Sequence, residues 1–565
     1  MSIFIKKPID SLLAEANDTG EHSLKRTLTG WGLVALGIGA IIGAGLFVRT
    51  AAAASQNAGP SVTLAFLLAA VGCALAGLCY AELSSSIPIS GSAYTYTYAT
   101  MGELLAWIIG WDLVLEYAVG AATVGIAWSE YLNNLLVEVF NTSPVPYEWC
   151  HSPFQHLNVI SISNAAEAAQ YSSFLSEASM QNLLANNQVA IDNNVLKTLP
   201  QALQETVSVK NGIINLPALG IVTAISLLLI RGTQESAFVN NLIVIIKVAI
   251  VVLIIALGWS HINPAYHVPY IPEATKYVDH QGITHNFGGI MGILGAAGTV
   301  FFAFIGFDAV STAAQETKNP KKAMPFGILG SLIVCTILYV LFSHVLTGLA
   351  PLEFFRDPSK GGEASVVAAI RESMPEYGWL SKSVTVAILA GFSSVILVML
   401  LGQSRVFFSM SKDGLLPKVF SEVHPKYKTP YKGNLVILIL VALFAAFVPG
   451  DVVGHMTSIG TLFAFMLVCA AVIILRKTEP NMPRQFKTPL VPFVPILGIL
   501  ACGAMIFGLG WENWARLGAW LALGFIIYFG YSKKQRKLNN PGKKAFGVIK
   551  KKPPVEQAAF FMITI

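Results

Sequence analysis

The fold of this chain is decided by one stretch, Gly37-Ile-Gly-Ala-Ile-Ile-Gly-Ala-Gly-Leu-Phe47, inside an apolar segment that begins near Trp31. Four glycines within nine residues disfavour a continuous helix, because each interior glycine costs about 1 kcal/mol relative to alanine. In a bilayer, unpaired backbone groups are tolerated only where they are buried in protein or line a cavity. The stretch therefore predicts a helix break at which N–H and C=O groups can meet a ligand. Close helix packing through Gly39 and Gly43 is the alternative use of these glycines.

A second apolar segment has a comparable interruption, Gly295-Ala-Ala-Gly-Thr-Val-Phe-Phe-Ala-Phe-Ile-Gly-Phe-Asp308. Its aromatic residues could stack over a substrate, although aromatic side chains in apolar segments more often only pack. Two interrupted helices at corresponding positions of two halves indicate the binding site of a secondary transporter. We therefore expect the two breaks to form the functional centre.

The composition is that of a polytopic membrane protein. Of the 565 residues, 54% are hydrophobic and 12% are charged, whereas soluble domains carry about 25% charged residues. The positive residues lie in loops between apolar segments, which argues against a nucleic-acid partner. Six cysteines, five of them in or near apolar segments, indicate no disulfide framework. No protease, hydrolase or metal-binding motif occurs, so we expect neither an enzyme nor a cofactor.

Twelve apolar segments can each cross the hydrocarbon core, which requires about 20 helical residues. They are residues 31–55, 61–87, 102–137, 213–230, 236–259, 288–316, 326–350, 381–411, 433–449, 455–475, 490–510 and 514–532. We therefore predict an all-α polytopic membrane protein with twelve transmembrane helices. The first ten segments form two units of five, each beginning with an interrupted helix. Because five is odd, the two units must be inverted relative to each other.

The positions of Lys and Arg predict that both termini are cytoplasmic, because 27 of these 37 residues then lie inside. The predicted parts are a cytoplasmic N-terminus (1–30), a first five-helix repeat (31–137 and 213–259), an extracytoplasmic insertion (138–212), a second five-helix repeat (288–475), helices eleven and twelve (490–532) and a basic cytoplasmic tail (533–565). The insertion could be a small cap with helices at 164–186 and 195–207, or a loosely ordered loop.

Lys247 lies within Leu242-Ile-Val-Ile-Ile-Lys-Val-Ala-Ile-Val-Val252, with apolar neighbours on both sides for more than a helical turn. A charge inside a span costs about 2.5–3.5 kcal/mol or more, so an ionisable residue there is a functional candidate. Desolvation lets a buried lysine exchange a proton near neutral pH, which predicts a proton-coupling role. The alternative is a structural ammonium group bonded to carbonyls at a helix break. Ser393 and Ser394 could hold this ammonium or a coupling ion, although helix–helix hydrogen bonding is their commoner use.

Four carboxyl groups also lie in or near the apolar segments. Glu116 is mid-span in Asp112-Leu-Val-Leu-Glu-Tyr117 and could face the central cavity, where it would favour a cationic substrate or bind a proton. A packing carboxylate bonded to tyrosine or backbone is the alternative. Asp308 follows the second break. Glu316 and Glu82 are expected near the cytoplasmic ends of their spans, as gate or loop contacts.

Four motifs together resemble one transporter superfamily. They are Gly39-Ala-Ile-Ile-Gly-Ala-Gly-Leu-Phe47, Trp111-Asp-Leu-Val-Leu-Glu-Tyr117, Phe301-Phe-Ala-Phe-Ile-Gly-Phe-Asp308 with Gln315-Glu-Thr-Lys-Asn-Pro-Lys-Lys-Ala-Met-Pro325, and Gly402-Gln-Ser-Arg-Val-Phe-Phe-Ser-Met-Ser-Lys-Asp-Gly-Leu-Leu-Pro417. The superfamily is that of amino acid–polyamine–organocation (APC) permeases, and the motifs resemble its cationic amino acid transporter branch with its bacterial relatives. The likeness covers residues 25–137 and 213–530; the insertion departs from it.

The resemblance implies a LeuT-type fold of inverted five-helix repeats with broken helices one and six. It implies that the N–H groups of Gly43, Ala44 and Gly45 hold the substrate α-carboxylate. It also implies carbonyl ligands for the substrate amino group around both breaks, at Ile41, Ile42, Phe302, Ala303, Phe304 and Ile305. These roles agree with helix dipoles, because a half-helix N-terminus attracts an anion and a C-terminus attracts a cation. Lys247 and Glu116 match the span-five lysine and span-three glutamate of the branch.

The sequence thus predicts a permease that imports neutral or cationic L-α-amino acids with protons by alternating access. One alternative is an amino acid exchanger without proton coupling, and another is a sensor that binds amino acids without moving them. The expected partners are the amino acid, protons and the lipid bilayer, in a bacterial inner (plasma) membrane. The sequence identifies no accessory subunit.

Overall fold

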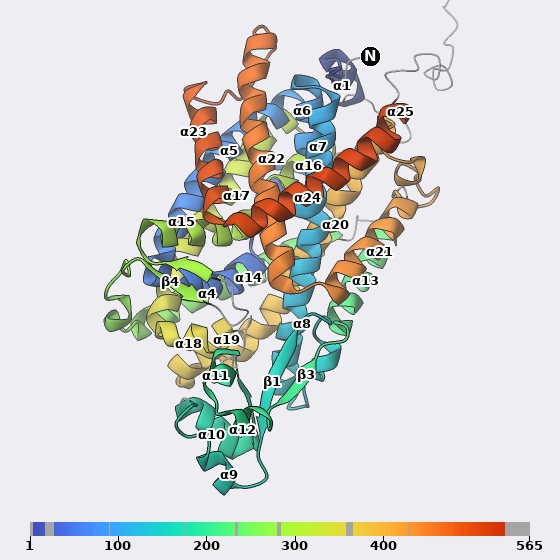
Figure 1. Cartoon of the computed structure of the whole chain (residues 1–565). Helices are drawn as coiled ribbons and strands as arrows, with labels where there is room; N and C mark the ends of the chain where they lie inside the picture. Colours follow the sequence, from blue (N-terminus) through green and yellow to red (C-terminus); the bar gives the residue numbers. More distant parts are fainter. Residues whose placement is uncertain are drawn as a thin grey trace, which may run out of the picture.

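A computed structural model describes residues 4–16, 28–89, 91–175, 177–191, 193–231, 236–278, 284–357, 365–427 and 429–536. It is a tall bundle of helices with a small domain projecting from one end (Figure 1). The helices α1 (Ile9–Ala16) and α25 (Lys533–Gln535), near the two described chain ends, both lie at the opposite end of the bundle. Part of the predicted basic tail, residues 537–565, lies outside the described residues.

Every predicted span contains a helix. In chain order these helices are α2 (Gly30–Ile41), α3 (Ala44–Phe47) and α4 (Arg49–Ala53), then α5 (Val62–Ser86), α7 (Glu103–Val114) with α8 (Gly120–Glu138), α13 (Leu216–Arg231), α14 (Ser236–Gly258), α15 (Gly289–Val300) with α16 (Ala309–Thr312), α17 (Pro320–Leu349), α20 (Gly378–Lys412), α21 (Tyr431–Phe447), α22 (Gly450–Thr478), α23 (Phe493–Gly508) and α24 (Trp511–Ile527). Shorter helices fill the connections; they are α6 (Ser92–Thr100), α18 (Leu352–Arg356) and α19 (Ser365–Ser373).

Length and apolar character support a membrane protein. Within the described ranges, seven helices are long and apolar enough to cross a membrane, or eight if the bent pair α23–α24 is one span. That pair bends by 111°, and α2, α13 and α21 are shorter apolar helices. The exposed large hydrophobic residues lie mostly on these helices, which is the surface that lipid would cover.

The all-α prediction needs a correction, because two small sheets occur. The insertion forms a three-stranded antiparallel sheet in the order β2 (Gln188–Ile191), β1 (His156–Ser161) and β3 (Ser208–Asn211). Four helices pack beside it, and they are α9 (Ala165–Ala169), α10 (Glu177–Asn186), α11 (Asn193–Thr198) and α12 (Gln201–Gln204). The insertion is therefore a folded cap with its own hydrophobic core, which includes Ile160, Tyr171 and Leu183. Strands β4 (Thr275–Val278) and β5 (Thr284–Phe287) form the second sheet, which is antiparallel and has two strands.

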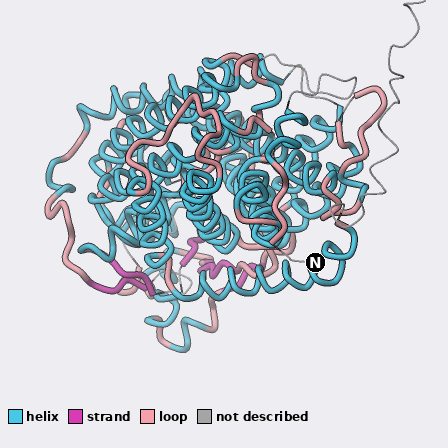
Figure 2. Tube along the Cα trace, turned by 90° about the horizontal axis from the view of Figure 1, so that it is seen from above, coloured by secondary structure: helices cyan, strands magenta, loops and turns pink. Residues whose placement is uncertain are grey.

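The helices pack in two groups that meet at the breaks. In one group, α17 packs along α5 and α2, and α15 along α5. In the other, α8 packs along α20 and α13, and α13 along α21. Helix α14 contacts both groups, and so does α22. Figure 2, a view from above, shows helices of the bundle running side by side. The candidate residues thus lie on elements of both groups, and Lys247 lies on α14, which contacts both.

Candidate functional site

The first predicted break lies where the glycine pattern placed it. Helix α2 ends at Ile41 and α3 begins at Ala44, because Ile42 (φ −73°, ψ 103°) and Gly43 (φ −159°, ψ −143°) leave the helical conformation. Both residues are buried. The N–H groups of Ala44 and Gly45 open the first turn of α3, where backbone donors have no partner within the helix. This turn can therefore offer donors to an anion.

The second break is also present. After α15, residues Phe301–Phe304 form a short 3-10 turn (η7), and the chain is extended at Ile305 (ψ 137°). Gly306 has φ 107°, a conformation that favours glycine. A Cβ on Gly306 would also lie 2.8 Å from Cβ of Ala40, so the second break fits closely against α2.

The two breaks touch each other. A Cβ built on Gly45 would lie 2.1 Å from Cα of Ala303. The Tyr339 hydroxyl, on α17, lies 2.8 Å from the Ile41 carbonyl oxygen and 2.9 Å from that of Ala303. Tyr339 therefore joins the loose ends of both interrupted helices. A substrate between the breaks would have to separate Gly45 from Ala303, so this is a closed arrangement.

Lys247 reaches the first break from α14. Its ammonium group donates hydrogen bonds of 2.8 Å to the carbonyls of Gly39 and Ile42. The side chain is 1% exposed, and its stem packs on Gly391 of α20, where a Cβ would lie 3.1 Å from Cδ of Lys247. The structural alternative weighed for Lys247 thus has the expected geometry, and a proton-coupling role stays a prediction.

The other residues expected at the breaks have partners of their own. Ser393 donates to the Leu389 carbonyl at 2.9 Å and Ser394 to the Gly391 carbonyl at 3.0 Å, both within α20. The carbonyls of Ile41, Ile42 and Ala303, expected to bind the substrate amino group, accept from Tyr339 and Lys247. A carbonyl oxygen has two lone pairs, so each can accept a second donor.

Glu116 lies in a different cluster, beside Asp308, which follows the second break. It belongs to a π-helical turn, η3 (Leu115–Val119), and is fully buried; such turns are frequent at functional sites. Its carboxyl group interacts with that of Asp308, and Asp308 accepts a hydrogen bond from the Tyr117 hydroxyl. The structure thus places Glu116 beside Asp308, whereas the sequence analysis treated them as separate candidates.

Glu316 follows the second break, at the end of a short 3-10 turn (Ala314–Glu316). Its carboxylate forms an ion pair with Arg405 of α20. The same guanidinium donates to the Thr312 hydroxyl at 3.2 Å. Arg405 therefore links α20 to the segment after the second break, and the gate role of Glu316 stays a prediction.

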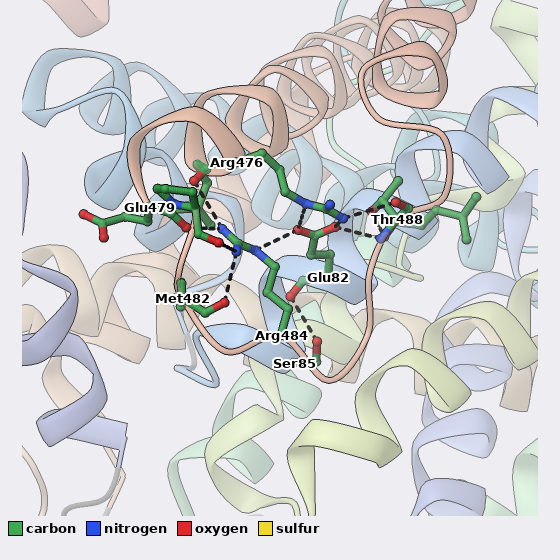
Figure 3. Close-up of polar contacts among 10 residues, drawn as sticks. Glu82, Ser85, Arg476, Glu479, Met482, Arg484 and Thr488 are labelled. Carbon is green, nitrogen blue, oxygen red and sulfur yellow. Dashed lines mark hydrogen bonds and ion pairs between the residues drawn. The ribbon is translucent and has the colours of Figure 1, made fainter.

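Glu82 is a loop contact, as expected, and it is fully buried (Figure 3). Arg476 donates to both of its oxygens at 2.7 and 2.8 Å, and Thr488 donates its N–H at 2.7 Å. Nε of Arg484 lies 3.2 Å from Oε1 of Glu82, and its terminal nitrogens donate to four backbone carbonyls of residues 475–482. Burial lowers the pKa of the Arg484 guanidinium, and the charge of Glu82 opposes that shift. The cluster fastens the loop between α22 and α23 to the C-terminal end of α5.

Glu82→Gln should lower the thermal stability of the purified protein strongly. Removing one partner of a buried ion pair costs about 3–5 kcal/mol when the remaining charge stays buried, as that of Arg484 (3% exposed) would. The measurement is the melting temperature in detergent, with Glu512→Gln as the control. Glu512 is 66% exposed and pairs with Arg516 at 3.6 Å, so its loss should change little. Equal melting temperatures for the two variants would contradict the role of Glu82.

Three contacts at the breaks were missed by the sequence reasoning. Tyr339 has one sequence signal, a hydroxyl inside an apolar span that must find a partner. Gly391 gives no signal, because its small size matters only where Lys247 crosses it. Arg49 is 5% exposed, donates to the Gly450 carbonyl at 3.2 Å and lies over the Phe302 ring. An arginine four residues after Gly45 could have been singled out by its charge within an apolar segment.

The chain is similar in sequence to proteins of one transporter family. The amino acid permease family model matches residues 28–525. The chain is 42% identical over 538 residues to the branched-chain amino acid permease BcaP of Bacillus subtilis, covering 95% of this chain and 99% of that protein. It is 37% identical over 539 residues to the methylthioribose transporter of the same organism, with the same coverage. It is 31% identical to the vacuolar cationic amino acid transporter 4 of Arabidopsis thaliana, over 85% of this chain and 68% of that protein.

Proposed function

Because the chain belongs to the amino acid permease family of the APC superfamily, we propose that it is a secondary transporter that imports L-α-amino acids by alternating access. The contact between the two helix breaks, at Gly45 and Ala303, is the observation that carries this proposal. Twelve helices cross a bacterial plasma membrane as inverted five-helix repeats of the LeuT type, followed by helices eleven and twelve. Both termini are cytoplasmic.

The substrate enters between the breaks and binds to backbone groups. Its carboxylate accepts from the N–H groups of Gly43, Ala44 and Gly45, at the positive end of α3. Its amino group donates to the carbonyls of Ile41 and Ala303, which Tyr339 already positions. Backbone groups recognise what all amino acids share. The side chain is neutral or cationic, which follows the branched-chain and cationic substrates in the names of the relatives.

Protons drive uptake through two groups of the chain. Lys247 is the coupling group, because its ammonium links α14 to the carbonyls of Gly39 and Ile42 at the first break. When protonated, Lys247 donates hydrogen bonds to these two carbonyls and stabilises the closed break. Deprotonation removes the positive charge and weakens these hydrogen bonds. The buried carboxyl groups of Glu116 and Asp308 hold a further proton on the inner side of the second break. An exchanger without proton coupling is the alternative.

Uptake into proteoliposomes tests the proposal. Labelled leucine and arginine are supplied with an imposed inward proton gradient. A one-unit pH difference coupled one to one should raise steady-state accumulation about tenfold, because each 1.4 kcal/mol is a factor of ten. Uptake that ignores the gradient but requires preloaded amino acid would identify an exchanger instead. Binding without uptake or exchange would identify a sensor.

A further inference from the structure

Three buried carboxyl groups form a row on the inner side of the breaks. Asp112 and Glu116 are four residues apart, so their side chains share one face along α7 and η3. Asp308 interacts with Glu116 from the second break. All three residues are at most 1% exposed.

These carboxyl groups lack donors. Within the part of the chain that the structure describes, five of their oxygens have no hydrogen-bond partner, namely both of Asp112, both of Glu116 and Oδ1 of Asp308. An ionised carboxylate only accepts, so neighbouring buried carboxylates cannot satisfy each other unless one carries a proton. The buried Tyr80 hydroxyl on α5, which interacts with Glu116 and Asp308, also has no partner there. These atoms point to protons and bridging water in the row.

Helix α22 lines the row and leaves space at Asp112. A Cβ on Gly460 would lie 3.0 Å from Oδ1 of Asp112, so this glycine makes room for the carboxyl group. The next residue, Thr461, donates its hydroxyl proton to the Thr457 carbonyl at 3.0 Å. Thr461 therefore supplies Glu116 with no proton of its own. Because Gly460 has no side chain, the Asp112 carboxyl group fits against α22, one helical turn from Glu116. Asp112 is therefore the next group along α7 that could accept a proton from Glu116.

The row has a direction. Helix α7 begins at Glu103, whose N–H donates to the Ile5 carbonyl at 3.0 Å. The start of α7 therefore lies at the end of the bundle that carries the N-terminal segment. At 1.5 Å per residue, Asp112 lies about 13 Å and Glu116 about 19 Å along the helix from Glu103. Asp112 is therefore between the Glu116–Asp308 pair and the end proposed to be cytoplasmic.

We propose that Asp112 is a proton-relay residue that receives the proton of the Glu116–Asp308 pair and passes it toward the cytoplasm; this rests on the proton coupling proposed above. The O–H bond on the pair breaks and an O–H bond forms on the ionised carboxylate of Asp112, so one negative charge moves from Asp112 to the pair. Side chains four residues apart on a helix are about 5–6 Å apart at Cβ, a span that one water can bridge. Asp112 then gives its proton to water from the inner side.

The test compares Asp112→Asn with Asp112→Glu in proteoliposomes that contain a pH-sensitive dye. Asparagine keeps the shape but cannot carry the proton, whereas glutamate keeps the carboxyl group. We expect Asp112→Asn to lower gradient-driven leucine uptake and internal acidification about tenfold or more. Exchange of labelled for preloaded leucine, which needs no net proton release, should stay within about twofold. Asp112→Glu should recover most of the gradient-driven uptake.

Each other outcome overturns the relay. Full gradient-driven uptake by Asp112→Asn would show that the proton leaves by another way. Equal loss of exchange and gradient-driven uptake in a variant that still elutes as a folded protein would show a structural role. A wild type that ignores the gradient would overturn the proton coupling itself, and the relay with it.

Gly460→Ala, which crowds the Asp112 carboxyl group without removing it, should impair gradient-driven uptake more than exchange.

Discussion

Gly45→Ala should reduce uptake by about two orders of magnitude. The added Cβ would lie 2.1 Å from Cα of Ala303 and 2.6 Å from its Cβ and N. Two of these three atoms are backbone, so no flexible side chain can move away. The breaks would have to shift apart in the closed state, and a misplacement of about 1 Å can cost about a hundredfold in rate. The measurement is initial uptake of labelled leucine into proteoliposomes.

A matched glycine provides the control for this substitution. Gly220 lies on α13, and a Cβ there would meet nothing within 4 Å. Gly220→Ala should therefore transport like the wild type and report any general effect of the change. Wild-type uptake by Gly45→Ala would show that transport does not require the two breaks to touch. That result would remove the main support for placing the substrate between them.

Lys247→Met should abolish the response of uptake to a proton gradient. Methionine retains an unbranched stem against Gly391 but removes the ammonium group and both of its hydrogen bonds. The carbonyls of Gly39 and Ile42 would be left buried without this donor, at a cost of about 1–3 kcal/mol each. We expect gradient-driven uptake to fall to the background of empty vesicles. The measurement is leucine accumulation with and without the gradient.

Two further measurements separate coupling from folding in this variant. Lys247→Arg keeps a positive charge that is not deprotonated in proteins, so it should close the break but fail to couple. Exchange of preloaded leucine shows whether the substrate site of Lys247→Met still forms. Exchange without a gradient response would support the coupling role. A full gradient response in Lys247→Met would refute it.

Local patterns in the sequence predicted the breaks, and contacts between distant residues could not be predicted. Four glycines within residues 37–45 weaken the helix at that point, whatever surrounds it, and the observed break lies at Ile42 and Gly43. Tyr339 lies on α17, after both interrupted helices in the sequence. The residues near it in the sequence do not indicate that its hydroxyl contacts the carbonyls of Ile41 and Ala303. The pairing of Glu116 with Asp308 likewise joins residues from different spans. Such contacts arise from packing and need the assembled fold.

The insertion shows the same limit for strands. Residues His156–Ser161 form a strand because they pair with Gln188–Ile191 on one side and Ser208–Asn211 on the other. The first two strands are separated by helices, and no two-residue turn marks a hairpin. A short strand gains stability only from its neighbours. The helices expected at 164–186 and 195–207 are present only as shorter pieces, which are α9 to α12.

The insertion enters and leaves the bundle through a single stem. His156 on β1 is opposite Asn211 on β3, and the Gly212 N–H donates to the Gln155 carbonyl at 2.9 Å. Its far helices, α9 and α10, lie at the tip of the projecting domain (Figure 1). An antibody fragment bound at that tip would add mass and an asymmetric landmark far from the helix breaks. The domain therefore offers an epitope for aligning particle images of a 60.6 kDa membrane protein.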